Sequence, residues 1–211
     1  MKYSCLFPIL ILLLSCSDRR DRLPFLGART LVDGIEKPYQ IPNFSFINQD
    51  SIIINNATFS DQIYVVDFFF TSCPTICPKM TQEMKRLHEH FLDYPEVAFI
   101  SHTIDVRRDT VGRLKKYAEN IGITNTEKWH FVTGDKEDIY EIADKYFNIV
   151  IEDSDAPEGF DHSGRFILVD KERHVRAFAE GTNPEEVDRL RADMEKLLKE
   201  YDEIGKRKAE N

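Results

Sequence analysis

The residues best suited to chemistry in this 211-residue chain are two cysteines, Cys73 and Cys77, in the motif C-P-x-x-C-P. They follow an apolar run at 63–70 and precede a helical pattern that begins at Pro78. Unpaired N–H groups at a helix start lower the pKa of a nearby thiol, so we expect reactive thiolates here. A spacing of four residues places both sulfurs on one side of the first turn. There they could form a disulfide or bind one soft metal ion such as Cu(I).

A dithiolate copper site needs a further ligand, and the chain has six histidines. We single out His162, because it follows an acidic stretch at 152–161 and precedes a predicted strand. A histidine in such a loop can reach a neighbouring strand-to-helix turn. We interpret the other five histidines as surface or packing residues.

Alternating strand and helix patterns must position these residues. A hairpin is predicted within residues 44–59. Strands are predicted at 63–70, 97–104, 129–132, 165–169 and 175–180, and helices at 78–92, 109–121, 135–147 and from 184 onward. This order predicts an α/β, thioredoxin-like fold in which helices flank a central mixed β-sheet that carries an N-terminal β-hairpin.

The first residues form a targeting pattern. Lys2 precedes an apolar run at 6–14, which is too short to span a bilayer as a helix. The run ends at Ser15 and Cys16, which resembles the bacterial lipobox, where the cysteine receives lipid and becomes the mature N-terminus. We expect a lipoprotein signal peptide at 1–15 and lipidation of Cys16. A plain signal peptide with an incidental cysteine is the alternative.

These features predict the organisation of the chain. After the signal peptide we expect a lipid-anchored flexible tether at 16–42, because this stretch is polar and contains dispersed proline and glycine. The globular domain should cover 43–204, with a C-terminal tail at 205–211. The protein should lie outside the cytoplasm, in the bacterial cell envelope, anchored to the membrane by lipid. A net charge of −9 argues against a nucleic-acid binder.

The residues around the cysteines resemble those of the SCO/SenC family, which consists of copper-handling thioredoxin-fold proteins tied to cytochrome c oxidase assembly. The resemblance covers roughly residues 40–200. The matching segments are T-S-C-P-T-I-C-P at 71–78, I-D-V-R-R-D-T at 104–110, W-H-F-V-T-G at 129–134, and D-H-S at 161–163 leading into I-L-V-D at 167–170.

The resemblance implies that Cys73, Cys77 and His162 bind a copper ion, as Cu(I) or Cu(II). Asp105 and Asp161 would support the site, Asp161 by orienting the histidine. Three positions depart from the family pattern. The family's D-P-E-R-D is D-V-R-R-D here, and Ile167 replaces an aromatic residue. Since none of these positions is a ligand, the departures concern partner docking more than metal binding.

Three functions follow from the resemblance and the thiol pair. The first is a copper chaperone, not an enzyme, that delivers copper to the dinuclear copper (CuA) site of cytochrome c oxidase. Its partner would be the copper-bearing oxidase subunit or another copper-accepting protein. The second is an extracytoplasmic thiol–disulfide oxidoreductase in which Cys73 and Cys77 act on the cysteines of that site. The third is a peroxide-reducing or redox-sensing protein on the same fold.

Overall fold

The structure, a computed structural model, describes residues 22–124, 126–148, 150–152 and 160–209. At 150–152, 160–162 and 208 only the backbone is described. The predicted signal peptide and Cys16 therefore lie outside the described residues. Of the helices that these ranges contain, none is both long enough and apolar enough to cross a membrane.

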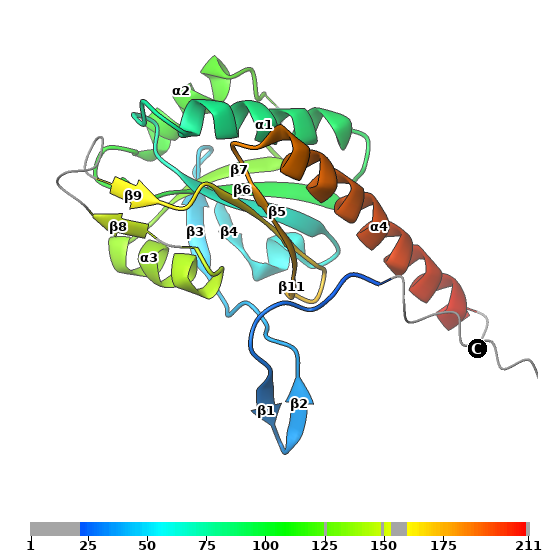
Figure 1. Cartoon of the computed structure of the whole chain (residues 1–211). Helices are drawn as coiled ribbons and strands as arrows, with labels where there is room; N and C mark the ends of the chain where they lie inside the picture. The colour runs from blue at the N-terminus through cyan, green and yellow to red at the C-terminus, as the bar shows by residue number, and fades with distance from the viewer. Residues whose placement is uncertain (1–21, 125, 149, 153–159, 210–211) are drawn as a thin grey trace, which may run out of the picture.

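A seven-stranded mixed sheet at the centre of the molecule has the order β11-β10-β5-β6-β7-β3-β4 (Figure 1). Its strands are β3 (Ser45–Asn48), β4 (Ile53–Asn55), β5 (Ile63–Phe69), β6 (Val97–Thr103), β7 (Trp129–Thr133), β10 (Arg165–Val169) and β11 (Val175–Glu180). The parallel strands β5, β6 and β7 occupy the middle, and the other pairings are antiparallel. The mixed sheet confirms the predicted α/β class. The β3–β4 pair is the hairpin predicted within residues 44–59, and the last residues of that predicted range form a short 3₁₀ helix, η1 (Asn56–Phe59).

The apolar run before the cysteines forms the central strand. All seven residues of β5 are buried, as expected for a parallel strand covered on both faces. β5 pairs with β6 along its whole length, from Ile63 opposite Val97 to Phe69 opposite Thr103. The end of β5 is therefore held firmly at the sheet edge from which the cysteine loop departs.

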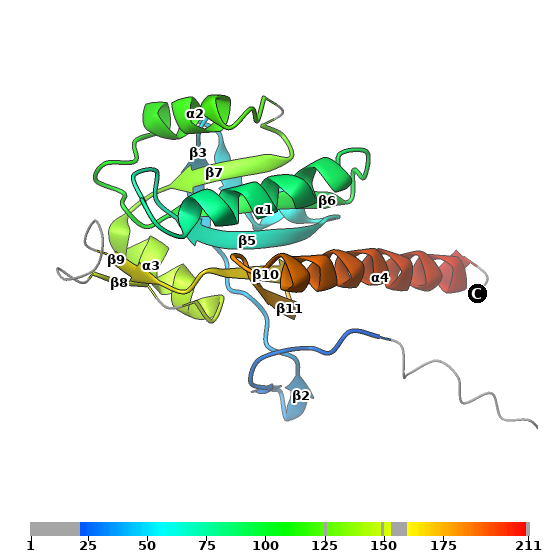
Figure 2. The ribbon, with the colours of Figure 1, turned by 45° about the horizontal axis from the view of Figure 1, so that its top comes forward.

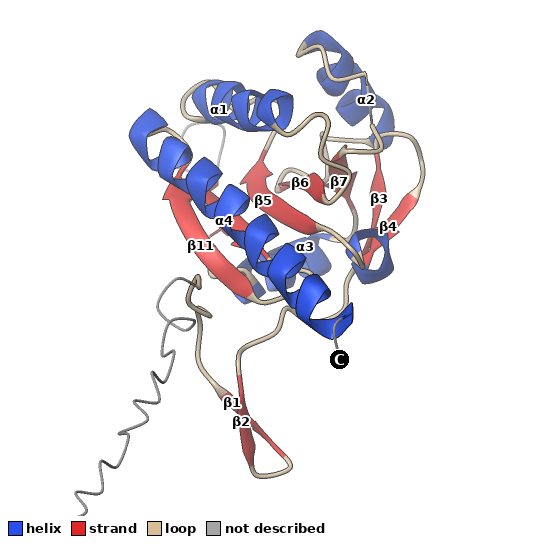
Figure 3. Ribbon diagram, turned by 90° about the vertical axis from the view of Figure 1, so that its right-hand side faces the viewer, coloured by secondary structure: helices blue, strands red, loops and turns tan. Residues whose placement is uncertain are grey.

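Helices cover both faces of the sheet. The α-helices within the described residues are α1 (Cys77–His90), α2 (Val111–Asn120), α3 (Lys136–Lys145) and α4 (Pro184–Ala209). On one face Phe69 contacts Tyr117 of α2, with ring centroids 5.3 Å apart. On the other face Phe68 packs on Tyr146, directly after α3, at 6.2 Å. Helices α1 and α4 lie side by side on the first face (Figure 2), and α3 lies behind the sheet (Figure 3).

Three features differ from the sequence-based description. Part of the expected tether is ordered, because it forms the hairpin β1 (Thr30–Val32) and β2 (Ile35–Lys37) and then packs on the domain. The acidic stretch contributes a two-stranded ribbon of β8 (Val150–Glu152) and β9 (Phe160–His162). Helix α4 continues to Ala209 through the expected tail, where an Arg207–Glu203 ion pair of 3.5 Å supports its last turns.

Candidate metal centre

The two cysteines lie where β5 ends and α1 begins. Cys77 is the first residue of α1 and is followed by Pro78, whose fixed φ suits a first helical turn. The backbone N–H of Cys73 donates to the Phe70 carbonyl at 3.2 Å, which folds the loop back over the strand end. Cys73 is 9% exposed and Cys77 only 2%. Cys73 is therefore the outer residue of the pair, and Cys77 the inner one.

Both cysteines are in the thiol form, and their side chains interact directly. A hydrogen bond with Cys73, followed by burial, raises the pKa of Cys77 well above its ordinary value. This direction is opposite to the lowering expected for a cysteine at a helix start, because desolvation and the neighbouring sulfur outweigh the helix dipole. Cys77 is therefore the thiol that keeps its proton longer.

A buried carboxylate, that of Asp67, lies in β5, the strand that leads to the cysteines. Asp67 is 3% exposed and accepts a short hydrogen bond from Ser101 of β6. Ser101 in turn accepts a hydrogen bond from the indole N–H of Trp129 in β7, at 2.9 Å. The negative charge of Asp67 contributes to the raised pKa of Cys77. This chain of polar groups lies inside an apolar run, and the sequence pattern gave no indication of it.

A cavity of about 250 Å³ adjoins both sulfurs. It lies between α1 and α2 and is lined by Phe70, Thr71, Cys73, Cys77, Pro78, Thr81, Tyr117 and Ile121. The Tyr117 hydroxyl contacts the Thr81 hydroxyl at 2.7 Å, and burial raises the pKa of Tyr117. Larger hollows on the described surface, such as the one beside Ile53 and His130, contain neither cysteine. The cavity at the sulfurs is therefore small and mostly apolar.

The Asp109 carboxylate fastens the start of the cysteine loop. It is fully buried and accepts the Thr71 backbone N–H at 2.9 Å and the Thr71 hydroxyl at 2.5 Å. It also accepts the Thr103 hydroxyl at 2.6 Å. Arg113 completes the cluster, because its Nε donates to the Thr71 hydroxyl at 2.6 Å and lies 3.4 Å from the carboxylate. Asp109 thus joins the loop after β6 to the loop that bears the cysteines.

Asp105, one of the two predicted supporting carboxylates, stabilises the turn in which it lies. Its side chain accepts the backbone N–H of Arg108 at 3.3 Å and forms an ion pair with the Arg108 side chain at 3.6 Å. Although it is only 3% exposed, each of these partners lies within three residues of it. The contacts to the cysteine loop are made by Asp109, four residues later.

The backbone of His162 ends β9, opposite Val150, and the described residues do not include its side chain or that of Asp161. The chain just after it approaches the cysteine loop. A Cβ on Gly164 would lie 3.6 Å from the side chain of Ile76, which immediately precedes Cys77. His162 therefore lies two residues before a position whose Cβ would contact the loop, while its role as a ligand stays a prediction.

The other histidines are engaged elsewhere. His102 and His130 lie on the sheet face that packs against α3, where His102 stacks on Phe68 at 4.9 Å. His88 of α1 is buried against Trp129, at 5.6 Å between ring centroids. His90 is at the surface and contacts Glu195, and His174 lies in the β10–β11 turn. These positions agree with the predicted surface and packing roles.

One cluster of potential ligands occurs among the described residues, at Asp170, Glu172 and His174. Asp170 already accepts the backbone N–H groups of Glu172 and His174 and pairs with Arg176 at 3.0 Å. Because β10 is antiparallel to β5, with Val169 opposite Tyr64, this turn lies at the sheet edge away from the cysteines. These residues therefore stabilise the turn between β10 and β11.

The mixed sheet with helices on both faces, and a thiol pair at the start of α1, define a thioredoxin-like protein with a C-x-x-x-C centre. The SCO1/SenC family model matches residues 32–199, and the chain belongs to this family. Over 133 residues it is 32% identical to an SCO1 protein homologue of Bacillus subtilis, covering 62% of this chain and 68% of the relative. An SCO2-like protein of Rickettsia conorii is 32% identical over 154 residues, which is 69% of this chain and 72% of the relative.

Solved structures show the same fold. A SCO1/SenC family lipoprotein of Bacillus anthracis has a TM-score of 0.68 and 26% identity over 76% of this chain and 95% of its own. BsSco, a Sco-family cytochrome c oxidase assembly protein with a disulfide switch, has a TM-score of 0.65 and 29% identity, covering 75% and 93%. Copper-bound ScoI of Arabidopsis thaliana has a TM-score of 0.63 at 21% identity, covering 75% and 98%.

Proposed function

We propose that this protein is a copper chaperone that holds copper through Cys73, Cys77 and His162 and delivers it to the CuA site of cytochrome c oxidase. The observation that carries the proposal is the contact between two buried thiols at the sheet edge, beside the chain that follows His162. Two sulfurs and an imidazole form a donor set suited to copper. Relatives on this fold bind copper, and BsSco belongs to an oxidase assembly family.

The burial of the thiols determines how copper would enter and leave. Copper binds the thiolates, so loading must release protons, and the last of them would come from Cys77 with its raised pKa. Cys73 is the more exposed residue of the pair, so an acceptor ligand would reach the copper ion from its side. The copper-bearing oxidase subunit or another copper-accepting protein would then take over the ion by ligand exchange.

The same thiol pair supports a second function, thiol–disulfide exchange. The Cys73 thiolate would attack a target disulfide and form a mixed disulfide with one target sulfur, releasing the other as a thiolate. Cys77 would then displace the bound sulfur, leaving a Cys73–Cys77 disulfide and a reduced target. The greater exposure of Cys73 favours it as the attacking group, and the disulfide switch of BsSco favours this function.

We further propose that the mature chain is a lipoprotein of the bacterial envelope, anchored through Cys16. The lipobox-like sequence supports this, as does the lipoprotein relative from Bacillus anthracis. The anchor would keep the metal centre close to membrane-bound acceptors.

Replacing His162 with Ala separates the two functions. We expect copper affinity to fall by about tenfold or more in this variant, because a ligand is lost. The reduction potential of the Cys73–Cys77 pair should stay nearly unchanged. Copper titration against a competing chelator and a thiol redox titration give the two values.

His174→Ala is the matched control, since it removes a histidine from the opposite sheet edge and should leave both values unchanged. Unchanged copper affinity in the His162 variant would contradict the proposed ligand set and leave thiol–disulfide exchange as the better account.

A further inference from the structure

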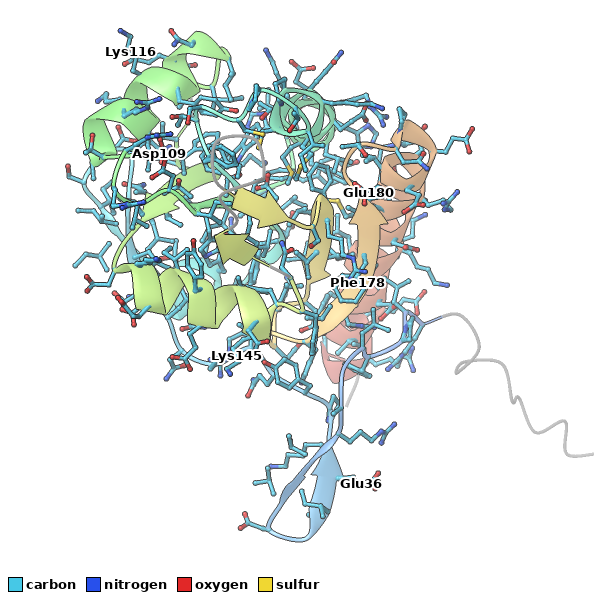
Figure 4. All side chains as sticks on the ribbon, turned by 60° about the vertical axis from the view of Figure 1, so that its left-hand side comes forward. Glu36, Asp109, Lys116, Lys145, Phe178 and Glu180 are labelled. Carbon is cyan, nitrogen blue, oxygen red and sulfur yellow. The ribbon has the colours of Figure 1, made fainter. Side chains whose placement is uncertain are left out.

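The β1–β2 hairpin exposes large apolar side chains to solvent. Leu31 is 74% exposed, Ile35 63% and Val32 40%, and all three lie within two residues of the turn. The hairpin projects away from the body of the domain (Figure 1), and Figure 4 shows Glu36 on it, far from the labelled residues of the domain. Apolar side chains gathered on a projecting element indicate a contact surface.

The tip of the hairpin has a defined shape. Its turn consists of Asp33 and Gly34 with φ values of 52° and 76°, the left-handed conformation that tight two-residue hairpin turns require. Val32 pairs with Ile35 directly across the turn, and Leu31 pairs with Glu36. Alternation along a strand places Leu31 on one side of the hairpin and the Val32–Ile35 pair on the other. One side of the tip is therefore apolar, and the other side carries Leu31 beside the charged Glu36.

The base of the hairpin is fixed to the domain. On its N-terminal side the Leu26 N–H donates to the Val175 carbonyl at 2.9 Å. On its C-terminal side the Ile41 N–H donates to the Arg173 carbonyl at 2.9 Å, and the Tyr39 hydroxyl donates to the Lys145 carbonyl at 3.0 Å. The projecting tip therefore has a set position relative to the sheet.

The segment that leads to the lipid anchor is fastened at the same edge. Arg176 is 4% exposed and donates to the Leu23 carbonyl at 2.7 Å and the Pro24 carbonyl at 3.1 Å. The Leu23 N–H donates to Glu200 of α4 at 2.6 Å. Cys16 precedes Leu23 by seven residues, which span at most about 25 Å when fully extended. A lipid on Cys16 would hold this edge of the domain close to the bilayer.

We propose that the hairpin tip is a second membrane contact, in which Leu31, Val32 and Ile35 insert at the boundary of lipid headgroups and acyl chains. The proposal rests on the lipid anchor at Cys16 and is independent of copper binding. Charges near the tip balance, since Arg29 and Lys37 oppose Asp33 and Glu36. Recognition therefore comes from apolar burial, and the Asp33 carboxylate at the turn keeps the insertion shallow.

Two contacts with the bilayer would orient the domain. The hairpin is attached beside the β10–β11 turn, and the register of β10 with β5 places that turn at the sheet edge opposite the cysteines. With the tip in the lipid, the Cys73–Cys77 edge points away from the membrane. An acceptor protein would then have access to the sulfurs from the aqueous side.

The test uses the mature lipidated protein, which begins at Cys16, in phosphatidylcholine vesicles, with tryptophan as the probe. Leu31→Trp places the probe at the tip. Ile53→Trp is the matched control, because Ile53 is 64% exposed on the distant edge strand β4. Wild-type emission from the buried Trp129 is subtracted from both. With lipids brominated near the headgroup end of the acyl chain, quenching of the tip probe should exceed that of the control at least twofold. Its quenching by aqueous acrylamide should fall when vesicles are present.

Equal lipid quenching of the two probes, with the tip still open to acrylamide, would overturn the proposal. Protection of the tip in vesicle-free solution that grows with protein concentration would also overturn it, since the occupant would then be a second copy. Flotation of the wild-type protein with the vesicles reports the anchor separately. No step involves copper, so failure here leaves the chaperone proposal unaffected.

Discussion

At the scale of single residues, the Asp109 carboxylate ties the cysteine loop to the loop that follows β6. It is fully buried and accepts two hydrogen bonds from Thr71, two residues before Cys73, and one from Thr103. Because both oxygens accept, an asparagine at this position would turn one acceptor into a donor facing other donors. Hydrogen bonds to a buried charge contribute about 1.5–3 kcal/mol each, so the loop depends strongly on this group.

We therefore predict that Asp109→Asn loosens the cysteine loop. Cys73 should react with iodoacetamide about threefold faster or more, because a loosened loop exposes a residue that is now only 9% exposed. The thermal midpoint of unfolding should fall as well. Asp105→Asn is the control, since its contacts stay within its own turn. If both variants changed the alkylation rate equally, the assignment of Asp109 would be wrong.

The sequence predicts those residues of the metal centre that lie together in a motif. It does not predict the residues that only the tertiary structure brings close to the centre. Cys73 and Cys77 stand out because two thiols four residues apart at a helix start are suited to redox chemistry or to binding a soft metal ion. Asp109 lies 38 residues from Thr71, and their contact exists only because β5 and β6 are neighbouring parallel strands. Asp67 was missed for a similar reason, since its partner Ser101 is on the adjacent strand.

At the scale of elements, two glycines join the segment after His162 to the end of β11. The Gly181 N–H donates to the Gly164 carbonyl at 2.6 Å. A Cβ on Gly181 would lie 2.8 Å from that carbonyl oxygen and 2.7 Å from the Phe166 ring. Neither neighbour can move easily, because one is backbone and the other is a fully buried side chain. The junction therefore requires glycine.

We predict that Gly181→Ala lowers the free energy of unfolding by about 1–3 kcal/mol, the usual cost of overpacking. Gly112→Ala should instead be neutral or stabilising by up to about 1 kcal/mol, because its Cβ meets nothing within 4 Å and it lies inside α2. Urea unfolding of both variants measures the difference. A Gly181→Ala protein as stable as the wild type would show that this junction can relax.

The bounds of buried strands could be predicted from the sequence, and those of exposed strands could not. The fully buried β5 and the strands β10 and β11 agree with their predicted bounds to within one residue. The ribbons β1–β2 and β8–β9 have three-residue strands, and β1 and β2 are exposed throughout. Such strands carry no apolar alternation, so the sequence pattern predicts a tether at 30–37 and an acidic loop at 152–161.

At the scale of the whole molecule, buried histidines make the fold sensitive to acid. Burial lowers the pKa of His102 to about 3 and that of His130 to about 4, and it also lowers the pKa of His88. An unfolded histidine binds a proton near pH 6.5, whereas these folded ones stay neutral to lower pH. Above pH 6.5 both states are neutral and stability is complete. As the pH falls below 6.5 the unfolded state gains protons first, so stability is lost until the folded pKa is reached.

The last prediction assigns part of this loss to His102. Between pH 7.5 and pH 5.0 each histidine with a folded pKa below 5 should remove about 2 kcal/mol from the free energy of unfolding. The His102→Leu variant lacks this titrating side chain. Its free energy of unfolding should therefore fall by about 2 kcal/mol less than that of the wild type over this interval. Any packing defect from the substitution affects both pH values equally and cancels in the difference. Urea unfolding at the two pH values measures it. An identical loss in wild type and variant would mean that His102 is protonated in the folded state, and that the face of the sheet under α3 admits water.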